Sequence, residues 1–133
     1  MTTHFLHIDP NTSIEEANLL FEAHSLSALP VCENNSFIGV LRKEAVEGAT
    51  KEALVSDYEY ALEHYFIPLT ATWDAVVEAF ALYQTDMLPV INEGGDFIGY
   101  YHLDEFVLQL IETPFIQEAG YVLILQKDIK YSF

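Results

Sequence analysis

The feature that most constrains the fold of this chain is an internal repeat. The motifs Leu29-Pro30-Val31 and Phe37-Ile38-Gly39 recur as Leu88-Pro89-Val90 and Phe97-Ile98-Gly99, with one more residue between the two motifs of the second copy. Each copy has only about 45 residues, which is below the size at which one hydrophobic core usually suffices. We therefore expect neither copy to be stable alone, and the two to pack together as one domain.

A helix is predicted at the start of each copy. Ser13 is a good N-cap with Glu16 three residues on, and Thr72 opens the counterpart. Apolar residues at helical spacing follow both caps: Ile14, Ala17, Leu20 and Phe21, ending near Ser25, and then Trp73, Val76, Val77, Phe80 and Ala81.

Two strands should follow each helix as a hairpin. Short apolar runs at 28–32 and 87–91 are typical of buried strands, and 37–41 and 97–101 provide their partners. The Asn and Gly residues between them tolerate the positive φ of hairpin turns. Because proline lacks an amide donor, we expect Pro30 and Pro89 to start strands or line an opening. Second helices are predicted at 43–47 and 103–112.

These elements divide the chain into four segments. Residues 1–48 form the first unit, 49–65 a packed connector, 66–115 the second unit, and 116–133 a C-terminal strand. The apolar tail strand indicates pairing with another chain or a truncated further domain.

Charge and composition exclude several classes of function. Lys and Arg total 5 against 21 Asp and Glu, and the formal net charge of −16 repels nucleic acids and anionic lipids. An acidic surface is the simple interpretation, and bound cations or partner chains are the alternative. Cys32 is the one cysteine, so no disulfide can form within the chain and a buried thiol is expected. With no signal peptide or membrane span in the sequence, we expect a cytoplasmic protein.

The sequence shows no catalytic or metal-binding constellation. It contains no phosphate loop, nucleophile elbow or Cys–His pair, and Gly94-Gly95 is interpreted as a turn. The remaining histidines share no close ligand spacing: His4, His7, His24 and His64. We therefore predict that the chain is not an enzyme and has no metal-binding site.

The repeated strand, turn and Phe-Ile-Gly motif resembles a tandem pair of cystathionine-β-synthase (CBS) domains, a Bateman module, over roughly residues 5–112. The resemblance implies an α/β (α+β) fold of two pseudo-symmetric βαββα CBS units packed through their sheets, and a homodimer. It also implies clefts that take AMP, ATP or S-adenosylmethionine as a regulatory ligand. The tail is similar to acetoin-utilisation-type bacterial CBS proteins, in which an ACT-like domain follows the pair.

The chain departs from the family's ribose-binding pattern, which is Gly, two apolar residues, Thr or Ser, two residues and Asp. The first copy has Arg42 and Ala45 at the hydroxyl and carboxylate positions, and the second has His102 and Glu105. Ala45 cannot accept hydrogen bonds from ribose, whereas Glu105 keeps a carboxylate. Arg42 could pair bidentately with a phosphate or carboxylate, or be a surface cation paired with Glu44 or Glu47.

The second cleft is therefore the better candidate for ligand binding, although His102 could equally be a polar residue that closes a strand. Tyr100 could stack on a base, but packing at a core edge or a dimer contact is favoured for the tyrosines. The predicted ligand-binding residues are Leu88, Pro89, Tyr100, His102 and Glu105, with Arg42. We predict a ligand-sensing regulatory module, and the alternative is a homodimeric interaction scaffold that binds no nucleotide.

Overall fold

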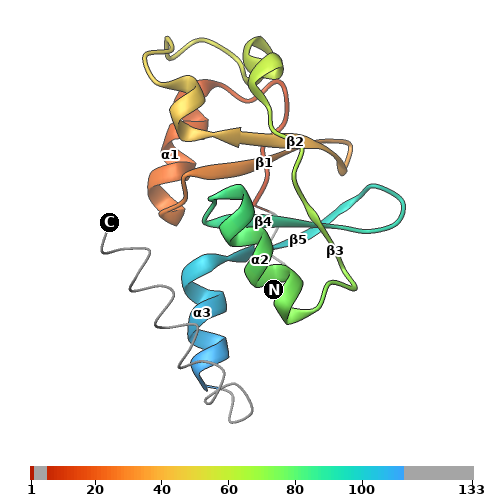
Figure 1. Ribbon diagram of the computed structural model, residues 1–133. Coiled ribbons are helices and arrows are strands. Elements are labelled where there is room, and N and C mark those ends of the chain that lie inside the picture. Colours follow the sequence, from red (N-terminus) through yellow and green to blue (C-terminus); the bar gives the residue numbers. More distant parts are fainter. Residues whose placement is uncertain (2–5, 113–133) are drawn as a thin grey trace. The chain divides into compact units, whose positions relative to one another are not determined.

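The computed structural model describes Met1 and residues 6–112 (Figure 1). Residues 1–102 form one compact unit, and Leu103 begins a second. The elements in chain order are α1 (Ile14–His24), β1 (Ala28–Glu33), β2 (Ser36–Arg42), the 3-10 helices η1 (Lys43–Val46) and η2 (Val55–Ala61), β3 (Ile67–Pro68), α2 (Trp73–Tyr83), β4 (Met87–Ile91), β5 (Phe97–His102) and α3 (Leu103–Glu112).

The element order repeats, as the sequence predicts. In the first copy Ile8 forms a parallel bridge to Val31 of β1, and β1 pairs antiparallel with β2. In the second copy β3 pairs parallel with β4, and β4 pairs antiparallel with β5. Each copy is thus a short strand, a helix, a hairpin and a second helix, which confirms the mixed α/β fold of two βαββα-like units.

The helices α1 and α2 begin and end in the same way. The Ser13 hydroxyl accepts a hydrogen bond from the Glu16 amide at 3.1 Å, and the Thr72 hydroxyl accepts one from the Ala75 amide at 3.2 Å. Ser25 and Gln84 then end the helices in the left-handed conformation, with φ of 52° and 49°. The caps predicted from Ser13 and Thr72 are therefore confirmed.

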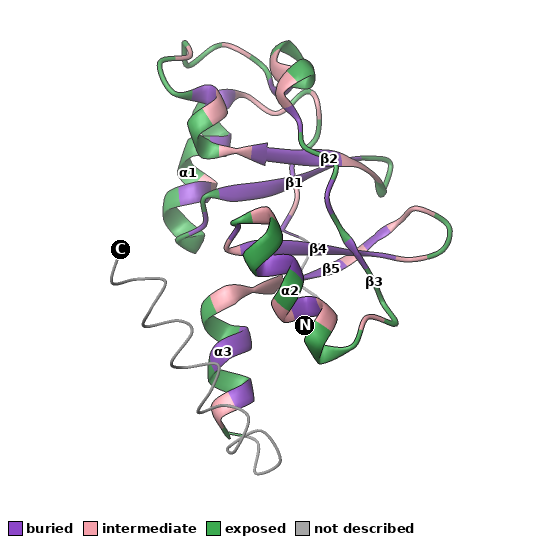
Figure 2. Ribbon diagram, viewed as in Figure 1, coloured by how far each residue is buried: buried purple, intermediate pink, exposed green. Residues whose placement is uncertain are grey.

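The buried stripe of α2 differs from the predicted one. Val76 and Phe80 are buried as expected, but Trp73 is 49% exposed and Ala81 also faces solvent. Ala79 is buried in their place. Figure 2 shows buried and exposed residues alternating along α2. The predicted stripe extended to both ends of the apolar pattern, whereas the face that α2 buries is narrower and consists of Val76, Ala79 and Phe80.

The two hairpins share a turn chemistry and an irregularity. Asn34 and Asn35 take positive φ of 50° and 69° between β1 and β2, and Gly95 does so at 87° between β4 and β5. Each hairpin shifts register at the same place, between Val31 and Cys32 or between Val90 and Ile91. The repeat therefore extends to the β-bulge, which strengthens local twist.

The two prolines lie inside strands, so the expectation that they start strands is wrong. Pro30 is opposite Val40 in β1, and Pro89 is opposite Tyr100 in β4. The carbonyl of Pro30 accepts a hydrogen bond from the Ile8 amide at 3.0 Å. The polar edge of Pro30 thus faces Ile8 and not β2, and the missing amide removes no bond from the β1–β2 ladder.

Reciprocal hydrogen bonds join the two hairpins, which lie side by side (Figure 1). The Phe37 amide donates to the Gly95 carbonyl and the Phe97 amide donates to the Asn35 carbonyl, both at 3.0 Å. The Ser27 amide also donates to the Asp86 carboxylate, 59 positions further along the chain, at 3.1 and 3.2 Å. These bonds connect equivalent positions of the two copies.

The connector packs against the first hairpin, as expected. Val40 and Glu63 exchange both backbone hydrogen bonds, at 2.7 and 3.0 Å, and Leu62 and Tyr65 are buried. Among the described helices none is long and apolar enough to cross a membrane. The predicted C-terminal strand and the start of an ACT-like domain, in residues 116–133, lie outside the described residues.

Candidate functional site

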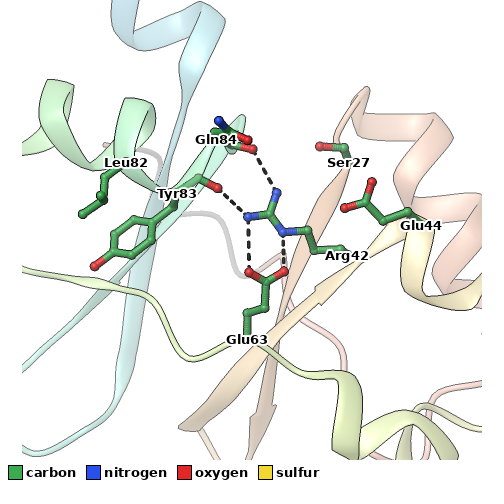
Figure 3. A pocket seen from close by; sticks show the side chains of 7 residues that line it. All are labelled: Ser27, Arg42, Glu44, Glu63, Leu82, Tyr83 and Gln84. Atoms are coloured by element: carbon green, nitrogen blue, oxygen red, sulfur yellow. Dashed lines mark hydrogen bonds and ion pairs between the residues drawn. The ribbon is translucent and has the colours of Figure 1, made fainter.

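A polar pocket of about 490 Å³ lies where the end of β2, the connector and the C-terminal end of α2 meet (Figure 3). Its lining residues come from both copies of the repeat and from the connector: Ser27, Arg42, Glu44, Glu63, Leu82, Tyr83 and Gln84. Arg42 is the residue that connects these elements.

The Arg42 guanidinium is held by hydrogen bonds from two directions. Its Nε and one Nη donate to the two carboxylate oxygens of Glu63, forming a bidentate ion pair. Its two Nη atoms also donate to the backbone carbonyls of Tyr83 and of Gln84, the latter at 2.9 Å. Four of the five guanidinium N–H groups are therefore engaged within the chain.

The surroundings favour a positive charge at this point. The carbonyls of Tyr83 and Gln84 form the C-terminal end of α2, where the helix dipole is negative. Burial alone lowers the pKa of Arg42, but its hydrogen bond to Glu63 and the negative charges of nearby groups outweigh burial and raise that pKa above its ordinary value. The guanidinium thus stays charged although its side chain is only 13% exposed.

An aromatic and hydroxyl cluster supports the guanidinium. Arg42 Cζ lies 5.4 Å from the centre of the Tyr65 ring, within the range of a cation–π contact, and Tyr65 stacks on Tyr83 at 4.9 Å. The Tyr65 hydroxyl lies 2.7 Å from that of Thr85, which in turn donates to the Met87 carbonyl at 3.0 Å. Burial raises the pKa of Tyr65 to about 12, so this hydroxyl stays protonated at a pH at which an exposed tyrosine ionises.

The partner predicted for Arg42 is wrong. The sequence suggested a surface cation paired with Glu44 or Glu47, whereas the side chain is largely buried and its ion pair is with Glu63 of the connector. Glu44 lines the same pocket but is exposed. The error arises because sequence proximity favoured neighbours along the chain, while the connector returns to lie beside β2.

Three of the residues predicted for the second cleft share one face of the β4–β5 hairpin. Pro89 is the register partner of Tyr100, and His102 is the register partner of Met87. Since side chains alternate along a strand, Pro89, Tyr100 and His102 project to one side and Leu88 to the other. Tyr100 is buried and His102 is half-buried at the end of β5.

Arg42 and Glu105 belong to other elements. Arg42 belongs to the first hairpin, and Glu105 is an exposed residue in the first turn of α3, in the unit that begins at Leu103. The structure therefore brings together Pro89, Tyr100 and His102 on one surface and separates Leu88 from them.

Sequence reasoning missed most of the groups around Arg42. Glu63 carries no motif, and the contributions of Tyr83 and Gln84 are backbone carbonyls, which leave no trace in side-chain chemistry. Tyr65 was expected to pack, and it is buried. The repeat was the one usable signal, because it makes Gln84, which ends α2, the counterpart of Ser25, which ends α1.

Two other candidate chemistries find no support in the described part of the chain. No group of three or more His, Cys, Asp or Glu side chains there could hold a metal ion. Cys32 is buried, as predicted, and burial raises the pKa of its thiol to about 12. It is thus a protonated core residue and not an activated nucleophile.

Two βαββα-like copies joined by a packed connector, with a polar pocket at the end of the first hairpin, define the architecture of a CBS-domain pair. The family model for the CBS domain matches residues 1–48, which is the first copy. The second copy lies outside these residues and is assigned from the internal repeat and from the fold. The chain therefore has the fold of a CBS-domain pair.

Solved structures share this fold at low sequence identity. A CBS domain pair/ACT domain protein from Thermotoga maritima is similar with a TM-score of 0.72 at 21% identity, over 84% of this chain and 92% of that one. CBSX2 in complex with AMP is similar with a TM-score of 0.67 at 17% identity, over 84% and 92% of the two chains.

Curated relatives match over part of their length. The inosine-5'-monophosphate dehydrogenase of Korarchaeum cryptofilum is 27% identical over 92 residues, which are 69% of this chain and 19% of the enzyme. The corresponding enzyme of Thermoplasma acidophilum is 26% identical with the same coverage. The chain spans about a fifth of the length of these two enzymes.

Proposed function

We propose that this chain is a regulatory CBS-domain-pair module that senses an adenine nucleotide or a related metabolite. The observation that carries the proposal is the fold, which is shared over 84% of the chain with CBSX2, a protein solved in complex with AMP. The half-buried His102 at the end of β5 and the buried Tyr100 beside it supply a hydrogen-bonding group and an aromatic ring on one surface.

The two copies are not equivalent as nucleotide sites, and the proposal places the ligand at the second. In the first, Arg42 is already paired with Glu63, and Ala45 offers no carboxylate for a ribose. In the second, His102 and Glu105 hold the positions at which the family's pattern has its ribose-binding residues. One nucleotide per chain is therefore the proposed stoichiometry, with Pro89, Tyr100 and His102 on the ligand-facing side of the hairpin.

Titration calorimetry of the full chain with AMP, ATP and S-adenosylmethionine tests this function. At least one of them should bind with a Kd well below 1 mM and a stoichiometry near one, and His102→Ala should weaken that binding. His64→Ala, which removes an exposed connector histidine, is the matched control and should bind like the wild type. Affinities no tighter than about 1 mM for all three, roughly −4.1 kcal/mol, contradict the proposal.

A second candidate function is a homodimeric interaction scaffold that binds no nucleotide. The polar pocket around Arg42 favours this function, because Glu63 and the helix carbonyls already satisfy the Arg42 guanidinium without any ligand. This function predicts a dimer by light scattering together with no heat of nucleotide binding. A monomer at micromolar concentration counts against the dimer that both functions assume.

The wider organisation of the protein is also a proposal. From the resemblance to acetoin-utilisation-type proteins we propose that an ACT-like domain follows the pair, and the similarity of the fold to a CBS domain pair/ACT domain protein supports this proposal. The boundaries at 48, 65 and 115, a cytoplasmic location and the lack of enzyme activity remain predictions from the sequence. The dehydrogenase activity of the two enzymes is not transferred, because the match covers 19% of each.

A further inference from the structure

Arg42 connects three segments that are far apart in the sequence. It ends β2 in the first copy, its ion-pair partner Glu63 lies in the connector, and its two carbonyl partners end α2 in the second copy (Figure 3). The separations along the chain are 21, 41 and 42 residues. One side chain thus crosses the boundary between the two copies.

The guanidinium is nearly saturated in this position. Four of its five N–H groups donate within the chain, and the Tyr65 ring lies beside it at 5.4 Å. An incoming phosphate or carboxylate could gain a bidentate pair with Arg42 only by displacing Glu63 or by releasing the end of α2. Displacement is opposed further because Glu44 and Glu63 both line the pocket and repel an anion.

The repeat supplies an internal comparison. The equivalent of Gln84 in the first copy is Ser25, which ends α1 in the same left-handed conformation. The equivalent of Arg42 in the second copy is His102, whose shorter ring cannot form a bidentate fork. The contact made by Arg42 is therefore not a general requirement of the repeat but a property of the first hairpin.

We propose that Arg42 is an intramolecular latch at the polar pocket, which fastens the connector and the C-terminal end of α2 to the end of β2. While the latch is closed the pocket excludes oxyanions, and the two copies are held together at this edge. Release of the guanidinium makes its donors available to an oxyanion in the pocket and frees the end of α2 locally, without unfolding the rest of residues 1–102. The proposal does not depend on nucleotide binding, because it concerns the chain without a ligand.

Amide hydrogen exchange measured by NMR on the full chain tests the latch. In Arg42→Ala the amides of Gln84, Thr85 and Met87, and that of Glu63, should exchange about tenfold faster or more, as expected from loss of charge-assisted hydrogen bonds. The amides of Ser25 and Leu26, at the equivalent end of α1, should keep their wild-type rates. Arg42→Lys should behave like Arg42→Ala, because one ammonium cannot reproduce the fork.

Two further variants separate the latch from a general effect of charge or stability. Lys43→Ala removes the same charge from the next, exposed residue and should leave all these rates unchanged. Glu63→Gln changes a side chain that is 48% exposed, so it should fold, and it should accelerate exchange at Gln84 and Thr85 to a smaller degree. Combining it with Arg42→Ala should add nothing to Arg42→Ala alone.

Two outcomes would contradict the proposal that Arg42 is a latch. Wild-type exchange at Gln84, Thr85 and Met87 in both Arg42→Ala and Glu63→Gln would show that the contacts fasten nothing. Equal acceleration of the amides at the ends of α1 and α2 would show that Arg42 only adds to global stability. A failure of nucleotide binding in calorimetry would leave these exchange results unaffected, so the two proposals fail independently.

Discussion

At the scale of single residues, the environment of Arg42 shows how a largely buried charge is made tolerable. Removing a guanidinium from water costs several kcal/mol unless its donors are paired, and here Glu63 and two helix carbonyls pair four of them. The two carbonyls also need a hydrogen-bond donor, because the last C=O groups of a helix have no N–H partner within that helix. Arg42 and the end of α2 therefore satisfy each other.

Tyr65 provides a pH-dependent test of this cluster. Its pKa in the folded chain is about 12, against an ordinary value near 10, so between these values only the unfolded state ionises and stability falls as pH rises. The stability advantage of the wild type over Tyr65→Phe should therefore shrink by about 1.4 kcal/mol between pH 8 and pH 11. Urea unfolding at a series of pH values measures this difference.

The matched control for Tyr65 is Tyr60, which is 84% exposed. Tyr60→Phe should follow the wild type across the same pH range, which accounts for effects shared by other titrating groups such as Cys32. A constant difference between the wild type and Tyr65→Phe from pH 8 to pH 11 would mean that burial does not protect the Tyr65 hydroxyl.

At the scale of elements, the connector is fixed to β2 by backbone hydrogen bonds. Val40 of β2 exchanges two backbone hydrogen bonds with Glu63, so the connector forms an isolated antiparallel bridge to β2. This pairing positions the Glu63 carboxylate for Arg42. The geometry of the pocket thus depends on how closely the connector approaches β2.

Gly39 permits this approach, and its replacement tests it. A Cβ at Gly39 would lie 3.0 Å from Leu62 Cβ and 3.1 Å from the Glu63 carbonyl oxygen, so the connector would have to move outward. Gly39→Ala should destabilise the chain by about 1 to 3 kcal/mol in chemical unfolding, the usual cost of overpacking. Gly94→Ala, whose Cβ would meet only the Asn92 side chain at 3.4 Å, is the control and should cost less. Equal costs would argue against a close approach.

At the scale of the whole molecule, the two copies complete each other's hydrogen bonding. The hairpin turns exchange the bonds of Phe37 with Gly95 and of Phe97 with Asn35, and Asp86 caps the amide of Ser27. A copy taken alone would leave these groups without partners and would expose the apolar surface that the other copy covers.

A fragment of residues 1–48 should therefore not fold on its own. We expect it to show no cooperative thermal transition by circular dichroism and little dispersion in its amide NMR spectrum, whereas residues 1–133 should unfold cooperatively. A fragment that melts cooperatively with native-like dispersion would mean that the first copy carries a sufficient core without its partner.

The sequence by itself determined the repeat, the helices with their caps, the two hairpins and the order of elements. These features depend on local patterns, namely apolar spacing, Ser13 and Thr72 as capping residues, and Asn or Gly in the turns, and such patterns are legible along the chain. The same local reasoning misjudged Trp73, because the depth of burial on a helix depends on what packs against it.

Only the tertiary structure decided what the first copy does with Arg42. Its partners lie 21 to 42 residues away, and two of them are backbone carbonyls that any residue would supply. No spacing rule predicts such a contact, since it depends on where the connector and the end of α2 come to lie once the hairpins have paired. The sequence already distinguished the two copies at Arg42 and Ala45, and the fold then paired Arg42 with a carboxylate of the chain itself.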